Sequence, residues 1–180
     1  MRRTSQLVIV ARTPLFDEAT IGSRVRDLGR QIADDGRGQD LLLLGILNSS
    51  APFLADLCRA IERPLEIDML AIRSLTDSQT LQIVKDTNAA VEGRHVVIVD
   101  TLVRTGRTLD YIARTIRARG PASLRLCALF DRPDAHSVDI EIAYRGFDCP
   151  TEHLVGYGLD YDGRFRELPA CFEMSAVPCA

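Results

Sequence analysis

Three short segments of this 180-residue chain are almost continuously apolar, and they constrain its fold more than any other feature. They are residues 41–47 (LLLLGIL), 96–99 (VVIV) and 124–130 (LRLCALF). A half-exposed strand would alternate apolar and polar residues, whereas a strand covered on both faces does not. The three segments therefore predict buried strands of a parallel sheet.

Helical patterns separate these segments. Apolar residues recur at helical spacing in residues 21–35, and helices are also predicted for residues 51–61 and 108–119. Strands and helices that alternate with short links predict βαβ units. The expected fold class is therefore α/β, with a parallel central sheet and flanking helices in a single domain over residues 1–180. Binding sites in such sheets lie beyond the carboxyl ends of the strands.

Composition and charge exclude several classes of protein. The formal net charge of −3 argues against a nucleic-acid binder. No apolar run approaches the roughly 20 residues that span a bilayer, so no membrane association is expected. The five cysteines are odd in number and none are spaced C-x-x-C, which disfavours a zinc site or disulfide framework and indicates a reducing, cytoplasmic compartment.

The most informative motif is residues 96–108, VVIVDTLVRTGRT, in which a buried strand runs into an acid and then a loop of Thr, Gly and Thr. Backbone amides at the start of the following helix, with two hydroxyls beside them, can hold a phosphate. Gly106 would let the backbone approach the ligand closely. The alternative is a simple turn between strand and helix with a threonine cap. The motif is not a Walker loop, because no Gly-Lys-Ser/Thr follows.

This motif resembles the phosphoribosyl pyrophosphate (PRPP) motif of type I phosphoribosyltransferases. The similarity to hypoxanthine-guanine phosphoribosyltransferases extends over residues 16–169 and includes segments 41–47, 55–57, 83–86, 119–125, 154–161 and 165–169. The resemblance implies the type I fold, with a small hood built from about residues 1–20 and 145–180. It also implies Mg²⁺-assisted transfer of 5-phosphoribose from PRPP to a purine nitrogen, and a homodimer or homotetramer.

The resemblance also implies roles for individual residues. Catalytic roles fall to Asp100, Arg104 and Arg166, and Mg²⁺ would be bound near Asp100 and Asp160. The residues expected to bind PRPP are Asn48, Ser49, Asp100, Thr101, Arg104, Thr105, Gly106, Arg107, Thr108 and Arg166. Those expected to bind the base are Arg104, Arg132, His153, Leu154 and Asp160.

The sequence departs from the family mainly at the base-binding side. Arg104 stands where the family has the aspartate that faces purine N7, and a guanidinium stays protonated and cannot serve as a general base. Thr101 replaces the second of two adjacent acids. Three further positions differ, with Arg132 for a lysine, His153 for an aromatic residue, and Asn48-Ser49 for a Lys-Gly pair.

These departures leave three interpretations open. The acceptor is a 7-deazapurine such as a 7-cyano-7-deazaguanine-like base, whose substituent Arg104 would contact with its planar fork of donors. Alternatively, the acceptor is hypoxanthine or guanine, with less dependence on the missing acid. The third interpretation is a non-catalytic regulator that binds PRPP or a nucleotide.

Overall fold

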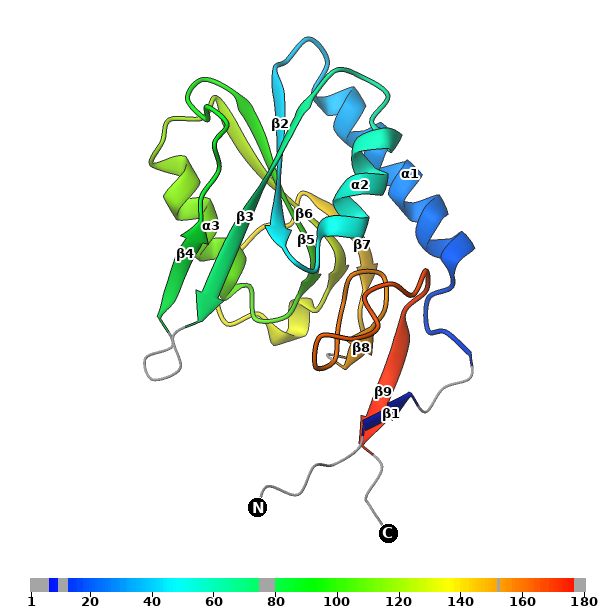
Figure 1. The fold of residues 1–180 in the computed structure, drawn as a ribbon. Helices are drawn as coiled ribbons and strands as arrows, with labels where there is room; N and C mark the ends of the chain where they lie inside the picture. Colours follow the sequence, from blue (N-terminus) through cyan, green and yellow to red (C-terminus); the bar gives the residue numbers. More distant parts are fainter. Residues whose placement is uncertain (1–6, 10–12, 75–79, 152, 177–180) are drawn as a thin grey trace.

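The computed structural model describes residues 7–9, 13–74, 80–151 and 153–176, and a six-stranded sheet forms its centre (Figure 1). Its strands are β2 (Leu41–Leu47), β3 (Glu66–Ser74), β4 (Leu81–Lys85), β5 (His95–Val103), β6 (Ser123–Asp131) and β7 (Tyr144–Asp148). They lie in the order β4-β3-β2-β5-β6-β7, and every neighbouring pair is parallel except β3 and β4. The predicted α/β class is confirmed.

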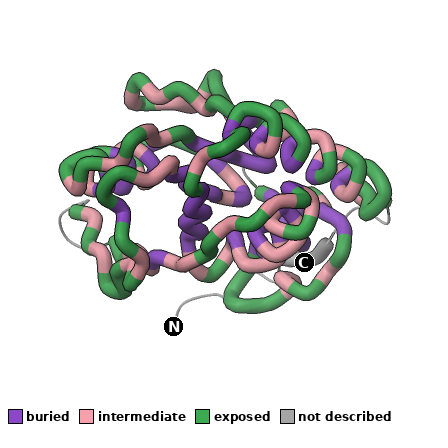
Figure 2. The backbone as a smooth tube through the Cα atoms, turned by 90° about the horizontal axis from the view of Figure 1, so that it is seen from above, coloured by how far each residue is buried: buried purple, intermediate pink, exposed green. Residues whose placement is uncertain are grey.

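Helices cover both faces of this sheet (Figure 1), and Figure 2 shows buried residues in the middle of the molecule and exposed ones around them. Helices α1 (Glu18–Asp35) and α2 (Ala51–Ala60) lie over one face and α3 (Arg107–Arg117) over the other. Along β2, Leu41 and Leu43 pack into the core under α1 and α2, whereas Leu42 and Leu44 pack under α3. The strand is apolar throughout because both of its faces are buried. In the described part of the chain, no helix combines the length and apolar character needed to cross a membrane.

The two edge strands escaped prediction from the sequence. β4 is antiparallel and mostly exposed, so it lacks an apolar run. On the neighbouring strand β3, the Asp68 carboxylate accepts hydrogen bonds from Thr87 Oγ1 at 2.7 Å and from Asn88 N at 2.6 Å. These bonds fasten the segment after β4 to the sheet. β7 follows β6 through residues 132–143, which contain only the short 3-10 helix η1 (Pro133–Ala135).

A second, three-stranded sheet joins the two ends of the chain. Strand β9 (Phe172–Ala176) pairs antiparallel with β1 (Leu7–Ile9) and with β8 (Leu154–Val155). Phe16 anchors this region to the main core, since its ring lies 4.7 Å from Phe130 and 4.8 Å from Phe147, measured between centroids. Of the segments expected to form a hood, residues 1–6, 10–12, 152 and 177–180 lie outside the described residues.

Helices α1 and α2 pack closely against each other at Gly29. A Cβ atom at this position would lie 2.6 Å from backbone atoms of Ala60. Gly22, two turns earlier in the same helix, has open space instead, because a Cβ there would meet nothing nearer than Arg26 Nη1 at 3.5 Å. The same substitution at the two positions should therefore have opposite effects.

We expect Gly29→Ala to lower the free energy of unfolding by about 1–2 kcal/mol, because the helices must separate to admit the methyl group. Gly22→Ala should raise it by about 0.5–1 kcal/mol, because alanine is the better helix former. Urea unfolding followed by circular dichroism measures both values. A Gly29→Ala protein as stable as Gly22→Ala would contradict the close helix contact.

Candidate functional site

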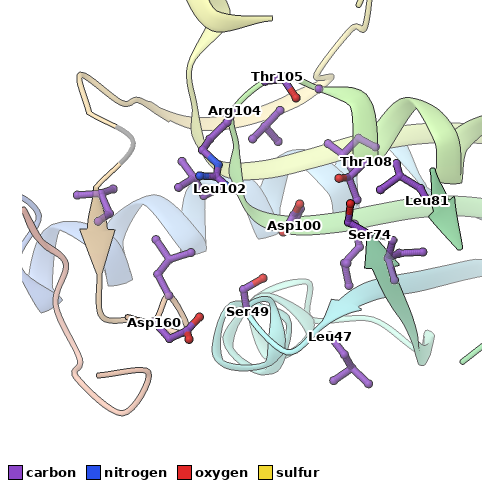
Figure 3. Close-up of a pocket in the computed structure, with 17 residues that line it drawn as sticks. Leu47, Ser49, Ser74, Leu81, Asp100, Leu102, Arg104, Thr105, Thr108 and Asp160 are labelled. Atoms are coloured by element: carbon purple, nitrogen blue, oxygen red, sulfur yellow. The ribbon is translucent and has the colours of Figure 1, made fainter. Parts of the chain in front are cut away.

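A cavity of about 450 Å³ opens at the carboxyl ends of β2, β3 and β5 (Figure 3). These strands run parallel, so the residues that follow them meet at one edge of the sheet. Leu154 and Asp160, from β8 and the turn beyond it, close another side. The cavity is therefore built by the main sheet and by the C-terminal part of the chain together.

One wall is the loop between β5 and α3. Gly106 precedes the helix with a φ of 78°, a left-handed conformation that suits glycine. Glycine has no side chain that could accept a hydrogen bond from the first amides of α3, so Gly106 does not cap them. Thr105, Gly106 and Thr108 all line the cavity. Amides at a helix start beside hydroxyl groups attract a phosphate, so this wall suits an anionic ligand.

The same loop is held in place from behind by residues 137–140. Ser137 N donates a hydrogen bond of 3.0 Å to Thr105 O. A Cβ on Gly106 would lie 2.6 Å from Ile140 Cδ1, so Ile140 packs directly on the glycine. The main chain of the loop is thus fixed before any ligand arrives, which lowers the entropy cost of binding.

Asp100 lies in the second half of β5, between the buried residues Val99 and Thr101, and lines the cavity. Burial raises the pKa of its carboxyl to about 6. Hydrogen bonds from the Thr101 and Leu102 amides and from the Ser49 side chain lower this pKa in part, and so does the positive charge of Arg104. The Thr101 amide lies 2.8 Å from Asp100 Oδ1. A carboxylate held in this way retains affinity for a cation or a ribose hydroxyl.

Arg104 also lines the cavity but is exposed to solvent. Figure 3 shows Arg104 and Thr108 on opposite sides of Asp100. The positive charge of Arg104 lowers the pKa of Asp100 and so favours its ionised form. Arg104 can therefore donate hydrogen bonds to an occupant of the cavity but cannot accept a proton from it.

Asp160 reaches the cavity from the turn after β8. Its Oδ1 forms an ion pair of 2.7 Å with Arg166 Nη2, and its Oδ2 accepts a hydrogen bond of 2.8 Å from Gly163 N. Arg166 Nη1 also donates to Gly158 O at 2.7 Å. Arg166 therefore holds the Asp160 turn from behind and lines a separate groove on the α1 and α2 side.

The structure brings many of the expected site residues to this one cavity. They are Ser49, Asp100, Arg104, Thr105, Gly106, Thr108, Leu154 and Asp160. Other expected residues lie away from its lining, namely Asn48, Thr101, Arg107, Arg132, His153 and Arg166.

The residues off the lining have identifiable surroundings. Thr101 is fully buried and its hydroxyl donates to Ser49 O. Arg132 follows β6 directly, and its N donates to Val103 O at the end of β5. His153 O accepts from Met174 N at 2.8 Å. Asn48 is exposed in the turn after β2, next to a cis peptide bond between Leu47 and Asn48.

Sequence reasoning missed most of the apolar lining. The additional apolar lining residues are Ile46, Leu47, Ile72, Leu81, Leu102, Val103, Leu109 and Leu159, and the polar Ser74 also lines the cavity. Several of them occupy strand ends, so the rule that sites lie beyond the carboxyl ends of strands would have indicated them. Their apolar character alone does not distinguish them from core residues.

Comparisons with known proteins agree with this architecture. Residues 13–162, which include the whole described cavity lining, match the family model of the phosphoribosyl transferase domain. The hypoxanthine-guanine phosphoribosyltransferase of Mycobacterium bovis is 41% identical over 167 residues, which cover 87% of this chain and 83% of that protein.

Solved structures show the same similarity. A hypoxanthine phosphoribosyltransferase from Staphylococcus aureus has a TM-score of 0.87 and 35% identity, covering 91% of each chain. A hypoxanthine-guanine phosphoribosyltransferase from Bacillus anthracis, which holds a HEPES molecule in its active site, has a TM-score of 0.89 and 29% identity. It covers 94% of this chain and 99% of its own.

Asp100→Asn tests the burial of the carboxyl at the base of the cavity. The pKa of Asp100 rises from 3.8 to about 6 on folding, so the folded chain binds more protons than the unfolded chain between these values. The free energy of unfolding of the wild type, relative to Asp100→Asn, should fall as the pH rises from about 4 to about 6 and be constant above about 7. Urea unfolding of both proteins at several pH values measures this difference, and a rise with pH in the same window would show that Asp100 is not desolvated.

Proposed function

We propose a specific reaction for this chain, which belongs to the phosphoribosyl transferase domain family, a family of transferases. In this reaction it transfers 5-phosphoribose from PRPP to a 6-oxopurine such as hypoxanthine or guanine. The products would be a nucleoside 5′-monophosphate and pyrophosphate. The observation that carries this proposal is the convergence of the loop at residues 104–108, Asp100 and Asp160 on one cavity. The names of the similar proteins support purine salvage as the setting.

The loop at residues 104–108 would hold the 5′-phosphate of PRPP. Thr105 and Thr108 offer hydroxyl donors, and the amides at the start of α3 add partial positive charge. Asp100, at the base of the cavity, would accept hydrogen bonds from the ribose hydroxyls. In this position the ribose lies between the phosphate wall and the Asp160 side, where base and pyrophosphate would meet it.

The leaving pyrophosphate would lie by the turn after β2, beside Ser49. The bond between ribose and pyrophosphate breaks as charge builds on the leaving oxygens, so donors that face them accelerate the reaction. We propose that Ser49 and Asn48 supply such donors. The ion pair of 2.7 Å between Arg166 and Asp160 supports a role for Arg166 in keeping Asp160 in place. If this ion pair opens, Arg166 would contact the pyrophosphate instead.

The cavity has suitable ligands for Mg²⁺, which prefers carboxylate oxygens and substrate phosphates. Asp100 and Asp160 both line it, and Asp160 keeps its carboxylate fixed through Arg166 and Gly163. When bound, Mg²⁺ would neutralise charge on the pyrophosphate. The residues of this chain would orient the substrate around it.

For the base, we propose a site between Leu154 and Asp160, with Arg132 and His153 as outer contacts. Leu154 is buried and lines the cavity, which suits an apolar contact with a flat ring. The small sheet of β1, β9 and β8 would be the hood that covers this end of the single domain. A homodimer or homotetramer and a cytoplasmic location are further proposals, and light scattering would measure the first.

Arg104 favours a second candidate acceptor. A guanidinium in the cavity cannot take a proton from purine N7, but it can donate to a polar substituent at that ring position. A 7-deazapurine has carbon there and needs no proton acceptor. We therefore retain a 7-cyano-7-deazaguanine-like base as the second candidate.

Incubation of the protein with PRPP, Mg²⁺ and a panel of bases distinguishes the candidates, with pyrophosphate release as the measurement. We expect turnover with hypoxanthine or guanine, because the chain keeps the phosphate wall and both acids. Turnover with 7-deazapurines alone would contradict a 6-oxopurine acceptor and support the second candidate. Binding of PRPP without turnover of any base would contradict catalysis and favour a regulator.

Arg104→Asp tests the position of Arg104 relative to the base. An aspartate there can accept a proton, so kcat on hypoxanthine should rise at least about tenfold, while turnover of a 7-cyano-7-deazaguanine-like base should fall. Arg117→Asp, the same charge change in the exposed last turn of α3, is the control and should alter neither. Unchanged kinetics with every base would place Arg104 away from the acceptor.

A further inference from the structure

Thr101 is a fully buried polar residue next to Asp100, which lines the cavity. Its side chain is fully buried, and Oγ1 donates a hydrogen bond of 2.9 Å to Ser49 O. Successive side chains of a strand point to opposite faces. Asp100 points into the cavity, so Thr101 points away from it, and its hydroxyl cannot reach a ligand there. A role for Thr101 must therefore act through Ser49.

Ser49 is held from three directions. Its hydroxyl donates to the Asp100 carboxylate, and its carbonyl accepts from Thr101. On a third side it meets the main chain of Gly158, where a Cβ would lie only 2.0 Å from Ser49 O. The turn between β2 and α2 is thus wedged between β5 and the C-terminal segment.

These contacts continue as far as Asp160. Gly158 O accepts from Arg166 Nη1 at 2.7 Å, and Arg166 Nη2 pairs with Asp160 Oδ1 at 2.7 Å. Hydrogen bonds and close packing therefore connect Thr101 through Ser49, Gly158 and Arg166 to the acid on the other side of the cavity. The position of Ser49 therefore sets the distance between the β5 side of the cavity and its Asp160 side.

The chemistry at Ser49 O explains why a hydroxyl suits position 101. The carbonyl is an acceptor and needs a donor, which an ionised carboxylate cannot provide. A carboxylate here would set two acceptors against each other in a buried place. Threonine supplies the donor and has the branched shape that strands favour.

We propose that Thr101 is a positioning residue, which sets the Ser49 turn at the distance that the pyrophosphate of PRPP requires. This inference rests on the proposed function for its kinetic consequence but not for its structural one. Thr101 contributes no contact to the substrate. Its loss should weaken PRPP binding and slow the departure of pyrophosphate, because both depend on the position of Ser49.

Thr101→Val tests this role, because valine keeps the shape of threonine and removes the donor. We expect kcat/KM for PRPP to fall about 3- to 10-fold, the effect of one neutral hydrogen bond. In the ligand-free protein, amide hydrogen exchange in residues 48–54 should become faster. Thr101→Ser, which keeps the hydroxyl, should restore both values.

Thr115→Val is the matched control. Thr115 Oγ1 also donates a hydrogen bond of 2.9 Å to a main-chain carbonyl, that of Tyr111 in α3, and it does not line the cavity. This variant should leave kcat/KM for PRPP and exchange in residues 48–54 unchanged. If Thr101→Val does not fold, Thr101→Ala removes the hydroxyl without placing a methyl group against the carbonyl.

The outcomes separate the two proposals. A wild type that turns over no base would contradict the proposed function. Exchange in residues 48–54 would still test whether Thr101 holds the Ser49 turn in place. Unchanged exchange in Thr101→Val would overturn the positioning role. A loss of kcat/KM that Thr101→Ser fails to restore would overturn it as well, because it would indicate only a general loss of structure.

Discussion

The burial of β5 between two layers of helices is the constraint on which the rest of the structure depends. This strand pairs with β2 and β6, and its side chains pack into the cores on both faces. Its carboxyl end can then occupy only one place relative to its neighbours. Asp100, Thr101 and the loop at residues 104–108 all follow from that place, so a strand held by apolar packing positions the polar groups of the cavity.

Several polar groups around the cavity are stabilised by one another. Burial raises the pKa of Asp100, while amides, Ser49 and Arg104 counteract part of that rise. Asp160 is already paired with Arg166. Such groups need little rearrangement when a charged ligand binds, which is the physical basis of electrostatic preorganisation. The same arrangement makes the cavity sensitive to any change that moves the turn at Ser49.

The departures from the family fall into two physical classes. Thr101 is buried away from the cavity and bonds to the main chain, so its replacement of an acid changes how the site is supported. Arg104 lines the cavity, so its replacement of an acid changes what the site can donate or accept. Only the second class bears directly on the acceptor base. A substitution that looks like a loss in the sequence can therefore be a change of support in the structure.

The sequence by itself determined the buried strands β2, β5 and β6, the helices α1, α2 and α3 and the local motif at residues 96–108, because apolar periodicity and a glycine turn are properties of neighbouring residues. It also indicated Asp100 and Asp160 through resemblance. Only the tertiary structure decided which contacts join distant segments. The bond from Thr101 to Ser49 spans 52 positions, and β1 pairs with β9 across almost the whole chain. Contacts of this kind depend on how packed layers bring strand ends together, and no local pattern encodes that geometry.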